Sequence, residues 1–325
     1  MTAVRAARGF SFAGFVLAIG SAACFALSGI FASALISSGW SPGAATTARI
    51  LFAALALLIP TLVMLRGQWS RVLRAWRTIL LFGLLAIVAC QLSFFVAVQF
   101  IPPSLALLIE FMGPVLLMLW TWARTRLAPS GVTLLGAALA VLGLVAISGV
   151  LAGGALNPLG ILFALVAAVG NAAYFATGAS QEHGIAPLPF VGLGLALAAV
   201  GLGIVSAVGL LPFRISSSPV TIADAEVPAA AAVAGMVLVS TVCAYVLGVA
   251  ASRRLGATVA SFTGYSEAMF GIVWTIVLLS VVPTAIQWLG AALIIAGVVT
   301  VKVGELLRSR SSPRVGSSRR TTRNG

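Results

Sequence analysis

Long apolar stretches, separated by short polar segments, run along almost the whole chain. A helix that crosses a bilayer needs about 20 mostly apolar residues, because each residue adds about 1.5 Å. Within the stretches the apolar residues do not alternate with polar ones, which excludes membrane β-strands and predicts helices. Ten segments are long enough to span, and they cover approximately residues 12–36, 45–65, 78–100, 103–123, 130–151, 158–178, 188–211, 228–251, 256–279 and 284–304.

The composition of the 325 residues supports membrane insertion. The chain is 61% hydrophobic and 8% charged, and its mean hydropathy is +1.16, whereas soluble globular proteins carry about 25% charged residues. The three cysteines, Cys24, Cys90 and Cys243, lie inside apolar stretches, which excludes a disulfide-stapled secreted domain. We therefore expect a polytopic membrane protein and not a soluble enzyme.

The basic residues lie between the apolar stretches and in the C-terminal tail rather than on one domain. The net charge of +13 therefore does not indicate a nucleic-acid partner. With the N-terminus in the cytoplasm, every lysine and arginine except Arg49 and Arg214 falls in a cytoplasmic segment, as the positive-inside rule requires. This predicts that both termini are cytoplasmic. The abundance of alanine and the preference for arginine over lysine are typical of a high-GC bacterium, so we expect a bacterial inner membrane.

The second half of the chain repeats the first. When Leu135 is aligned with Leu289, the sequence Leu-Gly-Ala-Ala-Leu recurs, and in the same register Trp120 falls on Trp274. Each copy contains five spans, and an odd number makes the second copy enter the membrane from the opposite side. The predicted fold is an all-α membrane protein with ten transmembrane helices in two inverted five-helix repeats, an arrangement that recurs in secondary transporters.

The repeat divides the chain into two units with polar ends. The tail is expected to be disordered, because its Ser, Arg, Thr, Pro and Gly residues have nothing to bury. The expected parts are a cytoplasmic N-terminus at 1–11, the first five-helix repeat at 12–151, the second at 158–304, and a disordered basic cytoplasmic tail at 305–325.

Small residues predict where helices pack closely and where one of them breaks. Gly136 and Gly143 lie two helical turns apart on one face of the fifth span, and glycines recur at the same spacing in the tenth. Pro114, next to Gly113, removes a backbone hydrogen bond and should kink or break the fourth span.

Three ionisable residues lie inside the predicted spans: Arg49, Glu110 and Glu267. A charge at the bilayer centre costs at least a few kcal/mol, so such a residue is a functional candidate. In the repeat register Glu267 falls on Gly113, three residues from Glu110, so each copy offers one carboxyl on the same helix face. We expect both carboxyls to face a central cavity and to bind a proton or an amine. The alternative is a structural hydrogen bond.

Arg49 lies in the second span at a depth similar to that of Glu110. Two interpretations remain open for its side chain. It forms an ion pair with Glu110, or it extends to the outer lipid headgroups.

Hydroxyl and amide side chains on several spans predict the wall of a polar cavity. They are Gln91 in the third span, Asn171 and Tyr174 in the sixth, Tyr245 in the eighth and Tyr265 in the ninth. The sequence holds one histidine, His183, in a predicted loop, and neither a cluster of metal ligands nor a phosphate-binding glycine loop. We therefore expect neither a metal nor a cofactor.

The run Glu-Phe-Met-Gly-Pro-Val at 110–115 resembles the fourth helix of the drug/metabolite transporter superfamily, EamA type. Three runs are similar to the threonine/homoserine exporter branch: Glu-Phe-x-Gly-Pro at 110–114, Glu-His-Gly at 182–184 and Ser-Glu-Ala at 266–268, although Ala268 stands where that branch usually has proline. The resemblance covers about residues 12–304. It implies a five-plus-five helix fold and an exporter role.

Together these features predict a secondary active transporter rather than an enzyme. We expect an exporter of small polar metabolites such as threonine or homoserine, working by alternating access and coupled to protons or to exchange. The expected partners are a small-molecule substrate, a proton and the lipid bilayer, and a homodimer is left open. The alternatives are a passive channel and an efflux pump for lipophilic drugs.

Overall fold

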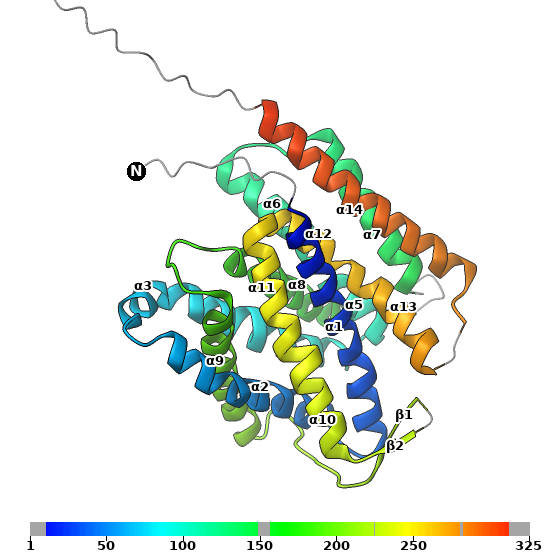
Figure 1. Cartoon of the computed structure of the whole chain (residues 1–325). Helices are drawn as coiled ribbons and strands as arrows, with labels where there is room; N and C mark the ends of the chain where they lie inside the picture. Colours follow the sequence, from blue (N-terminus) through cyan, green and yellow to red (C-terminus); the bar gives the residue numbers. More distant parts are fainter. Residues whose placement is uncertain (1–10, 149–156, 224, 280–281, 312–325) are drawn as a thin grey trace, which may run out of the picture.

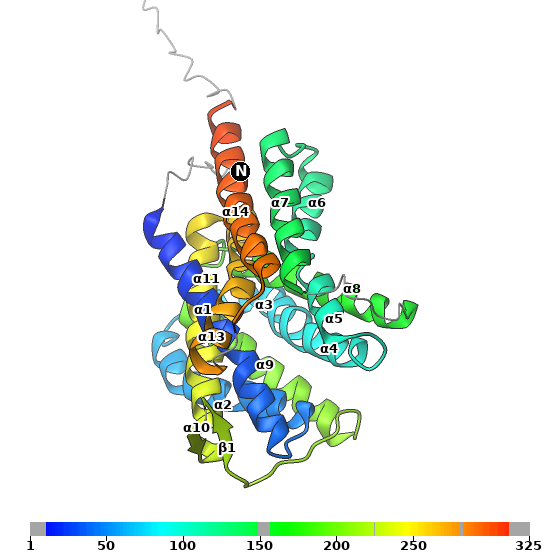
Figure 2. The ribbon, with the colours of Figure 1, turned by 90° about the vertical axis from the view of Figure 1, so that its right-hand side faces the viewer.

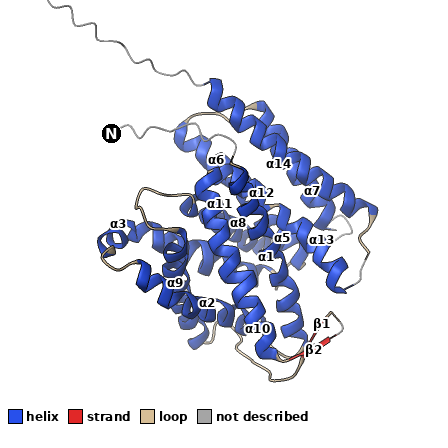
Figure 3. Ribbon diagram, viewed as in Figure 1, coloured by secondary structure: helices blue, strands red, loops and turns tan. Residues whose placement is uncertain are grey.

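The computed structural model describes residues 11–148, 157–223, 225–279 and 282–311. These residues are almost entirely helical (Figures 1 and 3). The exception within them is an antiparallel pair of short strands, β1 (Val220–Ile222) and β2 (Ala225–Val227). The all-α membrane fold expected from the hydropathy pattern is confirmed.

The first half of the chain forms the first five predicted spans. In the third span two α-helical segments flank a π-helical segment, η1, and the fourth span is divided in two. The segments are α1 (Phe12–Ser37), α2 (Pro42–Met64), α3 (Trp69–Leu80), η1 (Leu81–Ala89), α4 (Cys90–Ala97), α5 (Pro103–Glu110), α6 (Gly113–Thr125) and α7 (Gly131–Ser148).

The second half repeats this order, with a π-helical segment, η3, in its third span and a division in its fourth. The segments are α8 (Pro158–Gly178), α9 (Pro187–Ala207), α10 (Ala229–Val237), η3 (Leu238–Cys243), α11 (Ala244–Leu255), α12 (Ala257–Gly264), α13 (Ser266–Leu279) and α14 (Ala285–Ser311). Within the described residues, nine helical stretches are long and apolar enough to cross a membrane, and the two parts of the fourth span, Pro103–Thr125, count as one of them. The remaining predicted span, 256–279, is made by α12 and α13 together, and each of these is too short alone.

The irregular points of the two halves coincide in the repeat register. The fourth span breaks after Glu110 and the ninth breaks at Tyr265, and Tyr265 aligns with Phe111. The π-helical segments η1 and η3 end at Ala89 and Cys243, which are also equivalent positions. Pro114 lies in the first turn of α6, where its missing N–H removes no helical bond, so the predicted break is confirmed.

The contact between α7 and α14 shows that the two halves are inverted. Gly143 packs against Gly290, and a Cβ atom added at Gly143 would lie 2.5 Å from the Gly290 carbonyl oxygen. Gly136 packs against Gly297, so the chain advances along one helix while it retreats along the other. Equivalent helices that run antiparallel require a two-fold axis in the membrane plane, and Figure 2 shows the pair side by side.

The C-terminal helix is longer than predicted. The residues after 304 were expected to be disordered, yet α14 continues to Ser311. Glu305 and the two following leucines are strong helix formers, and Arg308 Nη2 donates a hydrogen bond of 3.1 Å to the Leu127 carbonyl oxygen. The expectation was therefore wrong for 305–311, and the rest of the tail lies outside the described residues.

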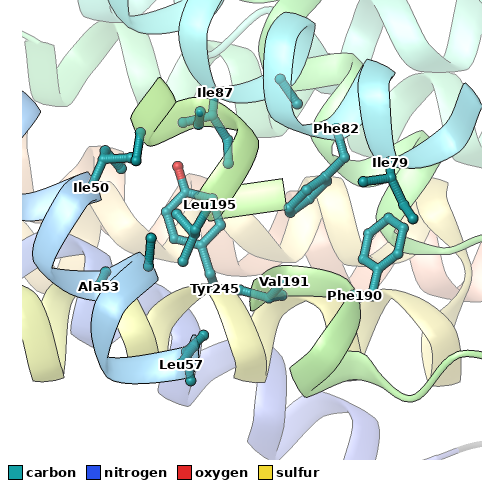
Figure 4. Close-up of a cluster of buried hydrophobic side chains, with 14 of the residues drawn as sticks. Ile50, Ala53, Leu57, Ile79, Phe82, Ile87, Phe190, Val191, Leu195 and Tyr245 are labelled. Atoms are coloured by element: carbon teal, nitrogen blue, oxygen red, sulfur yellow. The ribbon is translucent and has the colours of Figure 1, made fainter. Parts of the chain in front are cut away.

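The largest apolar core lies among α2, η1, α9 and α11. Figure 4 shows Ile50 and Leu57 of α2 facing Val191 and Leu195 of α9, with the ring of Tyr245 between the helices. This core fixes one side of Tyr245 and thereby aims its hydroxyl group away from the lipid.

Candidate functional site

A cavity of about 650 Å³ lies between the two halves. Along α1 the lining positions recur every three or four residues, from Ala18 through Ser21 and Phe25 to Ile36, so one face of the helix follows the cavity. The opposite walls come from α4, α5, α8 and α13.

Most of the predicted site residues meet at this cavity. They come from four different spans in addition to the two broken ones, although they are far apart in the sequence. The lining contains Arg49, Gln91, Glu110, Asn171, Tyr174, Tyr245 and Glu267.

The two carboxyl groups lie beside the equivalent helix breaks. Glu110 is the last residue of α5, and Glu267 lies in the first turn of α13. The Cys90 thiol lies 3.4 Å from Glu110 Oε1 and 3.4 Å from the Ala167 carbonyl oxygen, so its one proton is donated to either acceptor. Because each carboxyl is attached where the helix is interrupted, it projects into the cavity rather than along a continuous helix surface.

Arg49 follows neither of the two interpretations left open by the sequence. Its guanidinium lines the cavity, and Nη1 donates a hydrogen bond to Ser28 Oγ on α1. In the described part of the chain it makes no ion pair with Glu110, and its buried Nε has no hydrogen-bond partner. The ion-pair and headgroup predictions are therefore both wrong for this conformation, because Ser28 holds the guanidinium at cavity depth.

Tyr265 does not line the cavity, contrary to the prediction. Its side chain is 0% exposed and packs edge-on against Phe111 and Phe262, with ring centroids 6.3 and 5.5 Å away. The short helix α12 turns this face toward α7 and α14, whose side chains complete the same apolar cluster. Tyr265 therefore fills the break in the ninth span.

Gly113 makes room for the side chain of Asn171. A Cβ atom at Gly113 would lie 2.5 Å from Asn171 Oδ1, so the glycine lets α8 approach the break in the fourth span. Tyr174 and Tyr245 meet edge to face, with centroids 5.6 Å apart, and Phe25 contacts both rings. Asn171, Tyr174 and Tyr245 all line the cavity, but Asn171 Oδ1 and the Tyr174 hydroxyl are themselves buried and have no hydrogen-bond partner among the described residues.

The sequence interpretation missed Cys90, Ser28 and the aromatic share of the lining. Ser28 lies two turns from Ser21 on the same helix face, which was a usable signal. Nothing in the sequence separated Cys90 from the other cysteines in apolar stretches. The phenylalanines that line the cavity are Phe25, Phe94, Phe95, Phe111 and Phe175.

The cavity reaches one end of the helix bundle and stops short of the other. We call the first the hairpin end, where α1 ends at Ser37, α5 begins at Pro103, and β1 packs on α1. Lining residues reach Ile36 and Ser104 there. Toward the opposite end, where α1 begins, the lining stops at Ala251 and Ala260.

Comparison with known proteins identifies the family. The model of the EamA-like transporter family matches residues 12–149 and 158–303. The chain belongs to the EamA-like transporter family. As an EamA-like protein of the drug/metabolite transporter superfamily, it is a multi-pass membrane transporter of small molecules and not an enzyme.

A solved structure shares the fold of this EamA-like transporter. The structure titled "Crystal structure of protein" superposes with a TM-score of 0.70 over 92% of this chain and 99% of that chain, at 18% sequence identity. No curated protein sequence matches the chain.

Proposed function

We propose that this EamA-like transporter is a secondary active exporter of small polar metabolites such as amino acids. The observation that carries the proposal is the meeting of Glu110, Glu267 and Arg49 in one cavity between inverted halves. Charged groups are costly inside a bilayer and are retained where a polar solute or a proton passes. The resemblance of the run at 110–115 to the threonine/homoserine exporter branch supports export and an amino-acid substrate.

Alternating access follows from the inverted repeats. The cavity is accessible from the hairpin end. In the opposite state, the contacts that now close the other end would open, and the equivalent contacts at the hairpin end would close. The carboxyls of Glu110 and Glu267 carry a proton in one direction, and when deprotonated each binds an amine of the substrate. Export coupled to proton entry, or exchange of one solute for another, uses this same alternation.

We place the protein in a bacterial inner membrane with both termini cytoplasmic and the hairpin end outside. The distribution of lysine and arginine supports this orientation. The two five-helix units are assigned to residues 12–151 and 158–304. The lipid bilayer and a proton are the expected partners beside the substrate, and a homodimer remains open.

Proteoliposomes with an imposed pH gradient test the proposal, with threonine, homoserine, leucine and phenylalanine as solutes. We expect gradient-driven flux that saturates and that falls at least tenfold in Glu110→Gln and Glu267→Gln, because neither variant can release a proton at that position. Glu182→Gln, at an exposed loop position, is the matched control and should transport normally. Unchanged flux in both cavity variants would refute the carboxyl mechanism.

A second candidate function is efflux of lipophilic cations or drugs, which the five phenylalanines of the lining favour. This function predicts transport of lipophilic solutes and no transport of amino acids. A fluorescent lipophilic dye in the same vesicles distinguishes this function from amino-acid export. A passive channel would differ from both, since its flux would neither saturate nor depend on Glu110.

A further inference from the structure

Arg49 is a cation in the cavity wall that forms no ion pair with any described residue. Its Nη1 atom is bonded to the neutral hydroxyl of Ser28, and its Nε atom is buried with no partner in the described part of the chain. A buried charge is strongly unfavourable unless an opposite charge or several hydrogen bonds accompany it. The site is therefore electrostatically incomplete as it stands.

The opposite wall carries charge of the other sign. Arg49 lies seven residues from the first residue of α2, and Glu110 lies seven residues from the first residue of α5. Both helices begin at the hairpin end, so at about 1.5 Å per residue the two groups lie at the same depth of about 10 Å. Glu267 lines the same cavity from α13. The cavity thus holds a guanidinium and two carboxyls, of which Arg49 and Glu110 lie at one level.

The orientation of the guanidinium selects the shape of the missing anion. Nε is buried and one N–H of Nη1 is donated to Ser28, which leaves the second N–H of Nη1 and those of Nη2 for an incoming group. Two parallel N–H donors match the two oxygens of a carboxylate, whereas a spherical ion such as chloride uses the fork less well. Ser28 then acts as a positioning residue, because it fixes the plane of the guanidinium.

We propose that Arg49 binds the carboxylate of the transported substrate, so that the substrate is an α-amino carboxylate whose ammonium group faces Glu110 and Glu267. This inference rests on the proposed function and narrows its substrate class. The phenylalanines between the two charged walls contact the remainder of the molecule. A zwitterion neutralises the guanidinium on one wall and a carboxylate on the other at the same time. A simple amine or a simple acid neutralises one of them.

Binding to the purified full-length protein tests the assignment through selectivity. The probes are L-threonine, L-leucine and L-phenylalanine, each paired with its carboxamide, which keeps the amine and removes the negative charge. We expect the wild type to prefer each amino acid that it binds over its amide by about tenfold or more, since a charge-assisted bidentate contact is lost. In Arg49→Gln the preference should disappear, mainly through weaker binding of the amino acid.

Two further variants keep the test independent of folding. Arg49→Lys retains the charge without the fork and should keep part of the preference, and Ser28→Ala should reduce it by a few-fold. A thermal unfolding curve for each variant checks that it is folded. A structural role of Arg49 would lower the affinity for acid and amide alike and would leave their ratio unchanged.

The outcomes separate this inference from the proposed function. If Arg49→Gln keeps the preference for the acid while flux still requires Glu110 and Glu267, the carboxylate assignment is overturned and the exporter proposal stands. A second outcome uses chloride in place of gluconate. If chloride competes with the amino acid only when Arg49 is present, and the amide binds as well as the amino acid, Arg49 is an inorganic-anion site and the assignment also fails. If the wild type binds and moves none of the amino acids, both proposals fall.

Discussion

Two interfaces that are equivalent in the repeat differ in this structure. In the second half α8 packs against α11 and α12, and we call this the closed interface. Its counterpart in the first half lies between α1 and the pair α4–α5, and there the cavity separates Ser28 from Phe94 and Ser104. We call this the open interface. Nearly the same helices thus form both a closed and an open contact, which is the asymmetry that alternating access requires.

Apolar packing between the third and fourth spans is the same in the two halves. Ala97, Ile101 and Ala106 form a small buried cluster in the first half, and the equivalent residues Ala251, Leu255 and Ala260 form one in the second. Each half therefore retains the same apolar contact between its third and fourth spans. Phe175 of α8 packs against the cluster of the second half, so apolar contacts contribute to the closed interface together with polar residues that the two copies do not share.

Arg253 is such a residue, and it bridges the closed interface. Its Nε donates a hydrogen bond of 3.3 Å to the Gly178 carbonyl oxygen, and its Nη1 donates to the Ile185 carbonyl oxygen. The guanidinium also lies 5.3 Å from the ring centre of Phe190. The equivalent position in the first half is Gln99, which bonds only within its own helix turn. In the second half, hydrogen bonds from a charged side chain therefore hold the interface together, and we call Arg253 the latch. Among the described residues, the first half has no such contact at Gln99.

The largest expected effect comes from the crossing of α7 and α14, which joins the two halves outside both interfaces. A Cβ atom at Gly297 would lie 2.5 Å from the Ala140 backbone nitrogen, so Gly297→Ala should force α7 and α14 apart and destabilise the protein by about 1–3 kcal/mol. Gly131→Ala is the control, since a Cβ atom there meets open space. Thermal unfolding in detergent should show a lower Tm for the first variant alone. Equal Tm values would mean that the crossing is not the rigid pivot of the two halves.

Removing the latch should have the next largest effect. Hydrogen bonds to a charged group contribute about 1.5–3 kcal/mol, so Arg253→Ala should raise the population with the closed interface open by about tenfold or more. Ser252 is buried where α11 meets Gly178, and Ser252→Cys in a background without the three native cysteines reports that opening. Faster maleimide labelling is expected in Arg253→Ala and not in Arg254→Ala. Equal labelling rates would remove the latch from the explanation.

The sequence predicted the repeat and the cavity residues because those follow from local rules. Span length, the shared register and the cost of charge in lipid place Glu110, Glu267 and Arg49 without coordinates. It could not predict which interface is open, because the register makes both look alike. The sequence also wrongly predicted that Tyr265 lines the cavity. The face that the short helix α12 buries depends on how far the break in the span rotates that helix. The Ser28 contact of Arg49 arises from the relative rotation of two helices, which hydropathy does not encode.

A smaller effect is expected from pH at the closed interface. His183 stacks on Phe190 at 5.3 Å, and its Nδ1 accepts a hydrogen bond from the Ile185 backbone N–H, which requires a neutral ring nitrogen. Burial, and then the charge of Arg253, lower the pKa of His183 below its ordinary value near 6.5, while Glu182 opposes them. Arg71 faces the same loop and donates to the Gly184 carbonyl oxygen.

The sign of the pH effect follows from the lowered pKa of His183. The closed interface holds the histidine neutral, so its contribution is complete above pH 6.5 and is lost as the pH falls below that value. The labelling rate of Ser252→Cys, divided at each pH by that of free cysteine to remove the pH dependence of the thiolate, should rise a few-fold from pH 7.5 to 5.5. His183→Gln should flatten the dependence, whereas Glu182→Gln should retain it. A pH dependence that survives in His183→Gln would assign it to the cavity carboxyls instead.

The smallest effect is expected where the halves differ by one thiol. Cys90 contacts Glu110 through its thiol and aligns with Ala244, so the first half holds its carboxyl with a contact that the second half lacks. A thiol is a weak donor, and at 3.4 Å its loss in Cys90→Ala should change gradient-driven flux by no more than about twofold. Cys243→Ala, which changes an exposed cysteine, is the control. A loss of flux as large as that of Glu110→Gln would mean that the thiol, and not the break in the fourth span, positions the carboxyl.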